Sequence, residues 1–153
     1  MTRQALNDAL KEAMKARDSQ TVSTLRLVLA KLKDKDIEAR GKGRADGIDE
    51  AEVLAALQGM IKQRRESIEL YRQGAREDLI AQETAEIAVI ERFLPQQLDE
   101  AATREAIATA IAETGAAGIK DMGKVVAALK ARYAGQLDFG KASALVKDAL
   151  NAR

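Results

Sequence analysis

KQRRESIELYRQGAREDLIAQETAEIAVIERFLPQQL, residues 62–98, holds the features that decide how this chain folds. Before Gly74 the apolar residues recur at steps of three and four, which is typical of a helix with one buried face: Val53, Leu57, Met60, Ile61, Ile68 and Tyr71. We expect Gly74 to close that helix in the left-handed conformation. The acidic Glu77 then suits the start of a second helix. Pro95 must end this second helix, because proline lacks an amide hydrogen and disfavours helical geometry in the preceding residue.

Two further helices are expected on the N-terminal side of this stretch. The first is marked by Leu6, Leu10 and Met14 and should end near Arg17 and Asp18, with Ser19 capping the next helix. The second is long and runs toward Arg40, where the glycines of GKGRADG interrupt the pattern. Asp49 followed by Glu52 has the spacing of a capping box, which predicts the start of the helix that reaches Gly74.

Three shorter helices are expected after Pro95. Asp99 can cap the first of them and Gly115 can end it, the next should begin near Asp121, and Asp138 can cap the last. No stretch has the alternation of a strand. The sequence therefore predicts an all-α protein, with an N-terminal helical bundle of long hairpins over residues 1–94, a small three-helix domain over residues 95–153, and a hinge near Pro95.

The composition restricts the cellular compartments in which we expect to find this protein. There is no cysteine, so no disulfide framework or thiolate site can form. The N-terminus mixes Asp8 and Glu12 with its bases and resembles neither a secretory signal nor a transit peptide. No apolar run is long enough to cross a bilayer. These features lead us to expect a soluble cytoplasmic protein.

Charge is unevenly distributed along the chain although its net value is only +1. Residues 1–44 carry 11 Lys and Arg against 6 Asp and Glu, whereas residues 45–92 carry 6 against 11. This asymmetry has two interpretations. Antiparallel helices can use opposite charges to choose their partners, or a basic face can stay open for RNA.

Residue chemistry argues against an enzyme acting on its own, and we expect no catalytic residue, cofactor or metal. Histidine is absent, so the usual acid–base group near neutral pH is missing. The serines fall at caps or within amphipathic helices. GKGR at residues 41–44 lacks the spacing and the Lys-Ser/Thr ending of a phosphate loop. The carboxylates around Glu77 and Glu86 suit helix starts and helical pairs better than a metal site.

A basic cluster, formed by Lys62, Arg64, Arg65 and Arg72, lies on the helix before Gly74. Arg64 falls near the seam of apolar side chains. Buried beside an acid it would fix the pairing of helices, and exposed it would contribute to an anion site. The spacings of Lys62 to Glu66 and Arg65 to Glu69 favour the structural role.

Residues 62–98 also resemble a known family, as do IKDMGKVVAAL at residues 119–129 and LDFGKASALVKDAL at residues 137–150. Together they are similar to the YqeY family, small proteins that resemble the C-terminal tail of the B subunit of tRNA-dependent amidotransferases. The resemblance spans nearly the whole chain. It implies an appendage without the enzyme, because neither a glutaminase nucleophile nor phosphate-binding machinery is visible.

The resemblance implies a binding function. In the amidotransferase tail the corresponding module touches tRNA, which makes the bases of the C-terminal helices candidate RNA-binding residues: Lys120, Lys124, Lys130, Arg132 and Lys141. The partner would then be tRNA or a tRNA-handling enzyme. Two alternatives stay open, namely an accessory factor in carbon–nitrogen ligation with glutamine as amido-N-donor, and a protein-binding helical adaptor.

Overall fold

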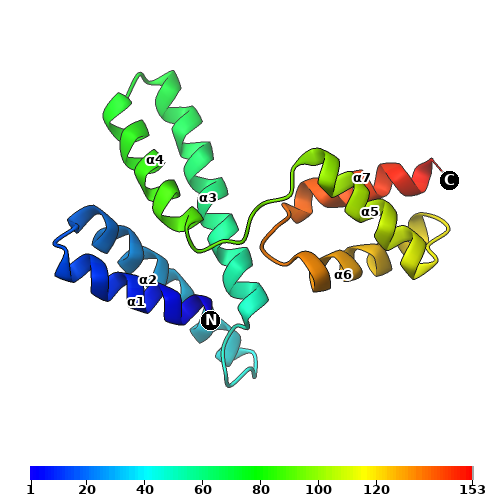
Figure 1. Cartoon of the computed structure of the whole chain (residues 1–153), viewed down its shortest axis with the longest axis horizontal. Coiled ribbons are helices and arrows are strands. Elements are labelled where there is room, and N and C mark those ends of the chain that lie inside the picture. The colour runs from blue at the N-terminus through cyan, green and yellow to red at the C-terminus, as the bar shows by residue number, and fades with distance from the viewer. Residues whose placement is uncertain (153) are drawn as a thin grey trace. The chain divides into compact units, whose positions relative to one another are not determined.

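The computed structural model describes residues 1–152, which contain seven α-helices, one short 3₁₀ helix and no strand (Figure 1). The prediction of an all-α chain is confirmed. The helices are α1 (Thr2–Lys15), α2 (Ser19–Gly41), α3 (Glu50–Gln73), α4 (Glu77–Glu91), α5 (Glu100–Thr114), the 3₁₀ helix η1 (Ile119–Asp121), α6 (Met122–Tyr133) and α7 (Phe139–Asn151).

The chain divides into two compact units, Met1–Leu94 and Pro95–Arg153, and each has its own apolar core. The first core gathers side chains from α1 to α4, among them Leu6, Leu25, Leu32, Leu57 and Ile90, all of which are fully buried. The second gathers side chains from α5 to α7, with Val125, Leu129 and Val146 at its centre. Burial of these apolar surfaces is the main force that holds each unit together.

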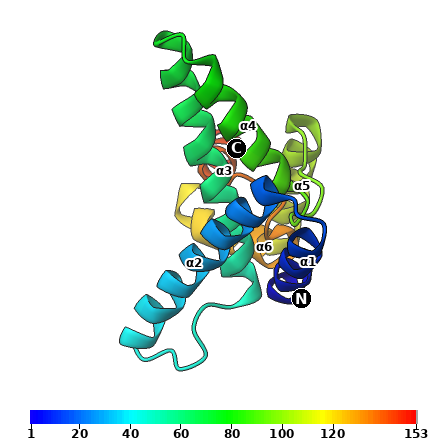
Figure 2. The same ribbon diagram turned by 90° about the vertical axis from the view of Figure 1, so that its left-hand side faces the viewer.

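In the first unit, α1 packs against α2, and α3 packs against α4. Figure 1 shows both pairs side by side, and Figure 2 shows α3 beside α4 from another direction. Arg64 of α3 lies in the seam of the second pair, where its Nε donates to Oε2 of Glu86 at 2.8 Å. Both side chains are largely buried, with 14% and 12% of their surfaces exposed. The predicted structural role of Arg64 is therefore confirmed.

Arg65 differs from its predicted pairing. It reaches Glu91 of α4 at 3.0 Å instead of Glu69 on its own helix, and Glu69 pairs with Arg72. Residues on different helices are free to meet wherever packing brings them together, whereas sequence spacing predicts only pairs within one helix. The acids of α4 thus complement the bases of α3.

The ends of the first four helices follow the sequence only in part. Asp49 and Glu52 form the predicted capping box of α3. Asp18, not Ser19, caps α2, because its carboxylate accepts the backbone N–H of Thr21 at 3.1 Å. Gly74 has an ordinary φ of −90°, and Ala75 adopts the left-handed conformation with φ 54°. The expectation of a left-handed Gly74 is wrong, since the chain leaves α3 one residue later.

The loop between α2 and α3, cyan in Figure 2, is anchored by the buried Asp36. Its Oδ1 accepts the backbone N–H of Ile48 at 2.9 Å and pairs with Arg3 of α1 at 2.6 Å. The hydrogen bond from Ile48 lowers the pKa of Asp36, and Arg3 adds to that shift. A Cβ on Gly47, whose φ is +78°, would clash with this oxygen. The close approach of the loop to Asp36 therefore requires glycine at this position.

The second unit is built from α5, η1, α6 and α7. Asp99 caps α5 by accepting the N–H of Ala102 at 2.7 Å, and Gly115 ends that helix in the left-handed conformation with φ 68°, both as predicted. Just before α5, the N–H of Leu98 donates to the carbonyl of Gln136 at 3.0 Å. The segment that enters this unit is thus tied to the connection between α6 and α7. Over the described chain, no helix combines the length and apolar character needed to span a bilayer.

Candidate nucleic-acid interface

The structure places the five candidate RNA-binding residues on three consecutive elements of the second unit. Lys120 lies in η1, α6 carries Lys124, Lys130 and Arg132, and Lys141 lies in the first turn of α7. All five residues are exposed to solvent. Their side chains are therefore accessible, but their environments differ.

Two of the five are engaged within the unit. Arg132 pairs with Glu113 of α5 at 3.1 Å, and the hydrogen bond to that carboxylate raises the pKa of Arg132. The ammonium of Lys130 lies 5.9 Å from the centre of the Phe139 ring, within the range of a cation–π contact. Both groups would have to exchange or share these contacts to bind a phosphate.

Lys120 and Lys124 flank Asp121. The carboxylate of Asp121 accepts the N–H of Ala117 at 2.9 Å, and this hydrogen bond lowers the pKa of Asp121, with smaller contributions from the two lysines. Asp121 makes no side-chain cap on α6, although it lies at the start of that helix. The reason is local, because a turn of 3₁₀ helix precedes α6 and directs the carboxylate back toward Ala117.

Lys141 lies beside a helix end that is filled as expected. Oδ1 of Asp138 accepts the N–H of Gly140 at 2.9 Å and that of Lys141 at 3.3 Å. No ion pair within residues 1–152 holds the ammonium of Lys141, Lys120 or Lys124. These three lysines are the ones best able to meet an anionic partner.

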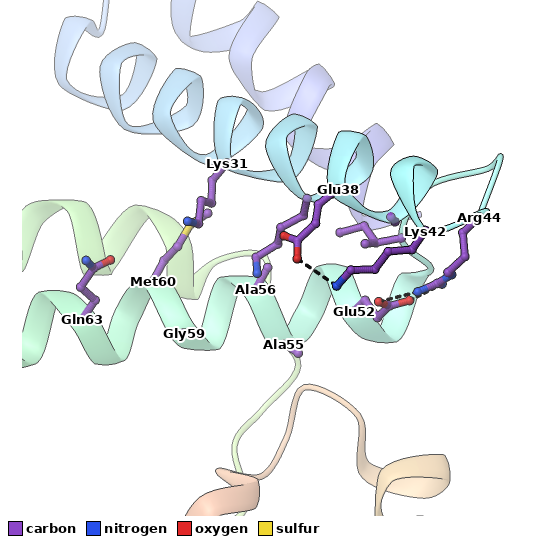
Figure 3. A pocket seen from close by; sticks show the side chains of 13 residues that line it. Lys31, Glu38, Lys42, Arg44, Glu52, Ala55, Ala56, Gly59, Met60 and Gln63 are labelled. Carbon is purple, nitrogen blue, oxygen red and sulfur yellow. Dashed lines mark hydrogen bonds and ion pairs between the residues drawn. The ribbon is translucent and has the colours of Figure 1, made fainter.

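A second charged feature lies in the first unit, in a groove of about 470 Å³ between α2 and α3 (Figure 3). Small and apolar side chains of α3 form its floor, and bases of α2 line its wall. In Figure 3 Lys42 pairs with Glu38, and Arg44 pairs with Glu52. The pairing with Arg44 lowers the pKa of Glu52 to about 2. GKGR thus forms a turn whose bases are neutralised by nearby acids.

No group of three or more His, Cys, Asp or Glu residues that could hold a metal ion occurs in the part of the chain that the structure describes. The exposed bases can bind and orient an anion. The chemistry available to these residues is electrostatic recognition.

The family model described as Yqey-like protein matches residues 3–150. The chain belongs to the YqeY family. The resemblance found in residues 62–98, 119–129 and 137–150 is thereby confirmed over nearly the whole chain.

Curated relatives of this YqeY-family chain include proteins named "Altered inheritance of mitochondria protein 41, mitochondrial". The protein from Lachancea thermotolerans is 36% identical over 91 residues, which are 60% of this chain and 46% of the relative. The protein from Kluyveromyces lactis is 35% identical over 89 residues, which are 58% of this chain and 46% of the relative. A Saccharomyces cerevisiae relative is 32% identical over 91 residues, which are 60% of this chain and 47% of the relative. The matched region is therefore about half the length of these relatives.

These names correct one prediction. The sequence led us to expect a cytoplasmic protein, but the YqeY relatives are named as mitochondrial proteins. The prediction was wrong because it relied on missing cysteines and on the composition of the first residues. The absence of cysteine does not identify a compartment, since a chain without thiols needs neither an oxidising nor a reducing environment to fold.

Sequence reasoning missed the groove of this YqeY-family chain. Two signals pointed to it, the lysines at positions 31 and 35, one turn apart on α2, and Gly59 in the interior of α3. They are separated by more than twenty residues in sequence. Only the packing of α2 near α3 brings them to one surface.

Proposed function

We propose that this protein is a non-catalytic binding module whose C-terminal helices contact the phosphates of tRNA. One observation carries the proposal. Residues 119–151 contain six Lys and Arg but only three Asp and Glu, and two of those acids, Asp121 and Asp138, accept backbone N–H groups. The lysines of this segment consequently outnumber the carboxylates that could neutralise them.

The chemistry of these lysines suits contacts with the RNA sugar–phosphate backbone rather than recognition of the nucleotide bases. A lysine ammonium is a strongly hydrated point charge with three donors, so it binds a phosphate without reading the bases. The preference for a folded RNA would come from the spacing of the lysines on η1, α6 and α7. A net charge of +1 gives little general attraction to polyanions.

The two other candidate functions rest on different features. An accessory factor in carbon–nitrogen ligation with glutamine as amido-N-donor would use the same module to approach an amidotransferase-type enzyme. A helical adaptor is favoured by an apolar groove of about 250 Å³ on α5 and α7, lined by Ile107, Ile111 and Leu145 among others. Adaptor binding through apolar side chains would respond weakly to salt, whereas phosphate binding would respond strongly.

We further propose that the two compact units act as separate domains, an N-terminal helical bundle and a C-terminal three-helix module. Separate apolar cores support this proposal. A domain of about 60 residues is marginally stable alone, so the second unit should be the weaker of the two.

The test is tRNA binding by the purified chain as a function of salt. If about four bases reach phosphates, log K should fall against log salt with a slope of roughly −3 to −4, about a hundredfold loss of affinity between ~50 and ~200 mM. The double variant K124A/K141A should flatten the slope by about two units. The control K11A/K62A removes two exposed lysines of the first unit and should leave the slope unchanged.

A folded tRNA should bind better than an unstructured RNA of equal length. Equal binding of both, or an unaltered slope in K124A/K141A, would reject the tRNA proposal in favour of the adaptor.

A further inference from the structure

At one end of the groove between α2 and α3, the basic side chains have no acidic partner within residues 1–152. Four bases line it, but Glu38 accepts from Lys42 at 3.2 Å and Glu52 accepts from Arg44 at 2.9 Å. These two ion pairs occupy the end nearest the loop. Lys31 and Lys35 line the other end, and no ion pair within the described chain holds either of them. The charge left to a partner is positive.

The floor beneath these lysines is low and apolar. Ala55, Ala56, Gly59 and Met60 of α3 form most of it, the polar Gln63 of α3 also lines the groove, and Figure 3 shows Lys31 extending from α2 toward Met60. A Cβ built on Gly59 would meet nothing within 4 Å, so the space above this glycine is open. Glycine in the interior of an exposed helix lowers helix stability, and at this position it leaves room for another backbone to come close.

Lys31 and Lys35 are four residues apart, so their side chains leave α2 about one turn apart on the same face. Two carboxylates one turn apart on another helix have the matching separation. The aliphatic stem of a lysine can lie along an apolar floor while its ammonium reaches an acid. The half-buried Lys35 fits that arrangement.

From this combination we infer that the α2–α3 groove binds an acidic amphipathic helix of a partner protein. The partner places small apolar side chains on Ala55, Ala56 and Gly59, and two carboxylates one turn apart meet Lys31 and Lys35. This is the helix-in-groove mode of recognition, with charge complementarity selecting the partner. The surface lies in the first unit and is separate from the proposed tRNA interface.

A binding measurement with defined peptides tests the inference on the full chain. The probes are a panel of fluorescent alanine-rich helical peptides that carry Leu and Ala on one face and two Glu residues one turn apart. A matched panel carries Gln in place of Glu. The Glu peptides should bind, and the Gln peptides should bind about tenfold more weakly or not at all.

Two variants locate the site. K31E/K35E should weaken binding of the Glu peptides by at least about tenfold. The control R26E/K33E makes the same change in net charge on exposed residues of α2 that do not line the groove, and it should bind normally. G59F should block binding by filling the groove, and unchanged helicity in circular dichroism would show that the variant is folded.

Several outcomes would overturn the inference. These are a failure of every Glu peptide to bind, equal binding of the Gln panel, or normal binding to both K31E/K35E and G59F. Displacement of the peptides by poly(U) would instead identify the groove as an RNA site. A concentration-dependent dimer abolished by K31E/K35E would identify a second copy of this chain as the occupant.

Discussion

The two units of this protein use their charged residues differently. In the first unit, charged side chains link separate elements: Arg3 with Asp36, Arg64 with Glu86 and Arg65 with Glu91. In the second, Arg132 with Glu113 is the ion pair between helices that the structure shows within the described residues. Its other bases largely face solvent. Ion pairs between helices thus recur in the first unit, whereas most bases of the second unit that the structure describes are exposed and take no part in such a pair.

The largest effect should come from the core of the smaller unit. Leu129→Ala removes a side chain that is 1% exposed, so it should destabilise that unit by about 2–5 kcal/mol. Because a small domain has little stability in reserve, α5 to α7 should lose hydrogen-exchange protection while α1 to α4 keep theirs. The reciprocal variant Leu57→Ala should lower hydrogen-exchange protection in α1 to α4 and leave it unchanged in α5 to α7. Loss of protection throughout the chain in Leu129→Ala would show that the units fold as one body.

A somewhat smaller effect should follow from breaking the Arg64–Glu86 pair. Arg64→Ala leaves a largely buried carboxylate without its partner, and we expect a loss of about 2–4 kcal/mol in chemical denaturation. The double variant R64M/E86L removes both charges and should lose less stability than Arg64→Ala.

Arg72→Ala provides the control for this pair, because Arg72 and Glu69 are 60% and 65% exposed, and it should cost no more than about 1 kcal/mol. A double variant as unstable as Arg64→Ala would show that packing, not charge, is what the pair provides.

Acid should weaken the first unit through its ion pairs. The pKa of Glu52 falls from 4.5 to about 2, and the pKa of Asp36 is also lowered. A lowered folded-state pKa contributes stability above the unfolded-state value and loses it as pH falls through the folded-state value. Stability should therefore decline between pH 4.5 and about 2, and Glu52→Gln should make this decline shallower. An unchanged acid profile in Glu52→Gln would contradict the assignment.

The smallest effect should be a gain of stability at the end of α3. Ala75 has φ 54°, a conformation that glycine adopts without the strain of a Cβ. Ala75→Gly should therefore raise the free energy of unfolding by up to about 1 kcal/mol, measured by denaturant titration. The control Ala81→Gly lies within α4, where glycine should cost about 1 kcal/mol. Equal destabilisation by both substitutions would mean that Ala75 is not strained.

Local signals accounted for what the sequence could predict. Helical periodicity identified the all-α class, and short-range patterns identified the caps at Asp49, Asp99 and Asp138 because each forms within a few residues. The left-handed Ala75 was not predictable from glycine placement, since the position at which the chain leaves a helix depends on the packing that follows. The ion pair between Arg65 and Glu91 depends on contacts between separate helices, and so does the α2–α3 groove. The spacing of residues along one helix does not predict such contacts.

The hydrogen bond from Leu98 to Gln136 gives the second unit a defined point of mechanical attachment. Force applied along the segment that enters this unit would first load that bond and, through it, the connection between α6 and α7. The start of α5, capped by Asp99, would be loaded only after the bond had broken. Under tension, the unit should therefore begin to open at the turn that precedes α7, while α5 is still helical.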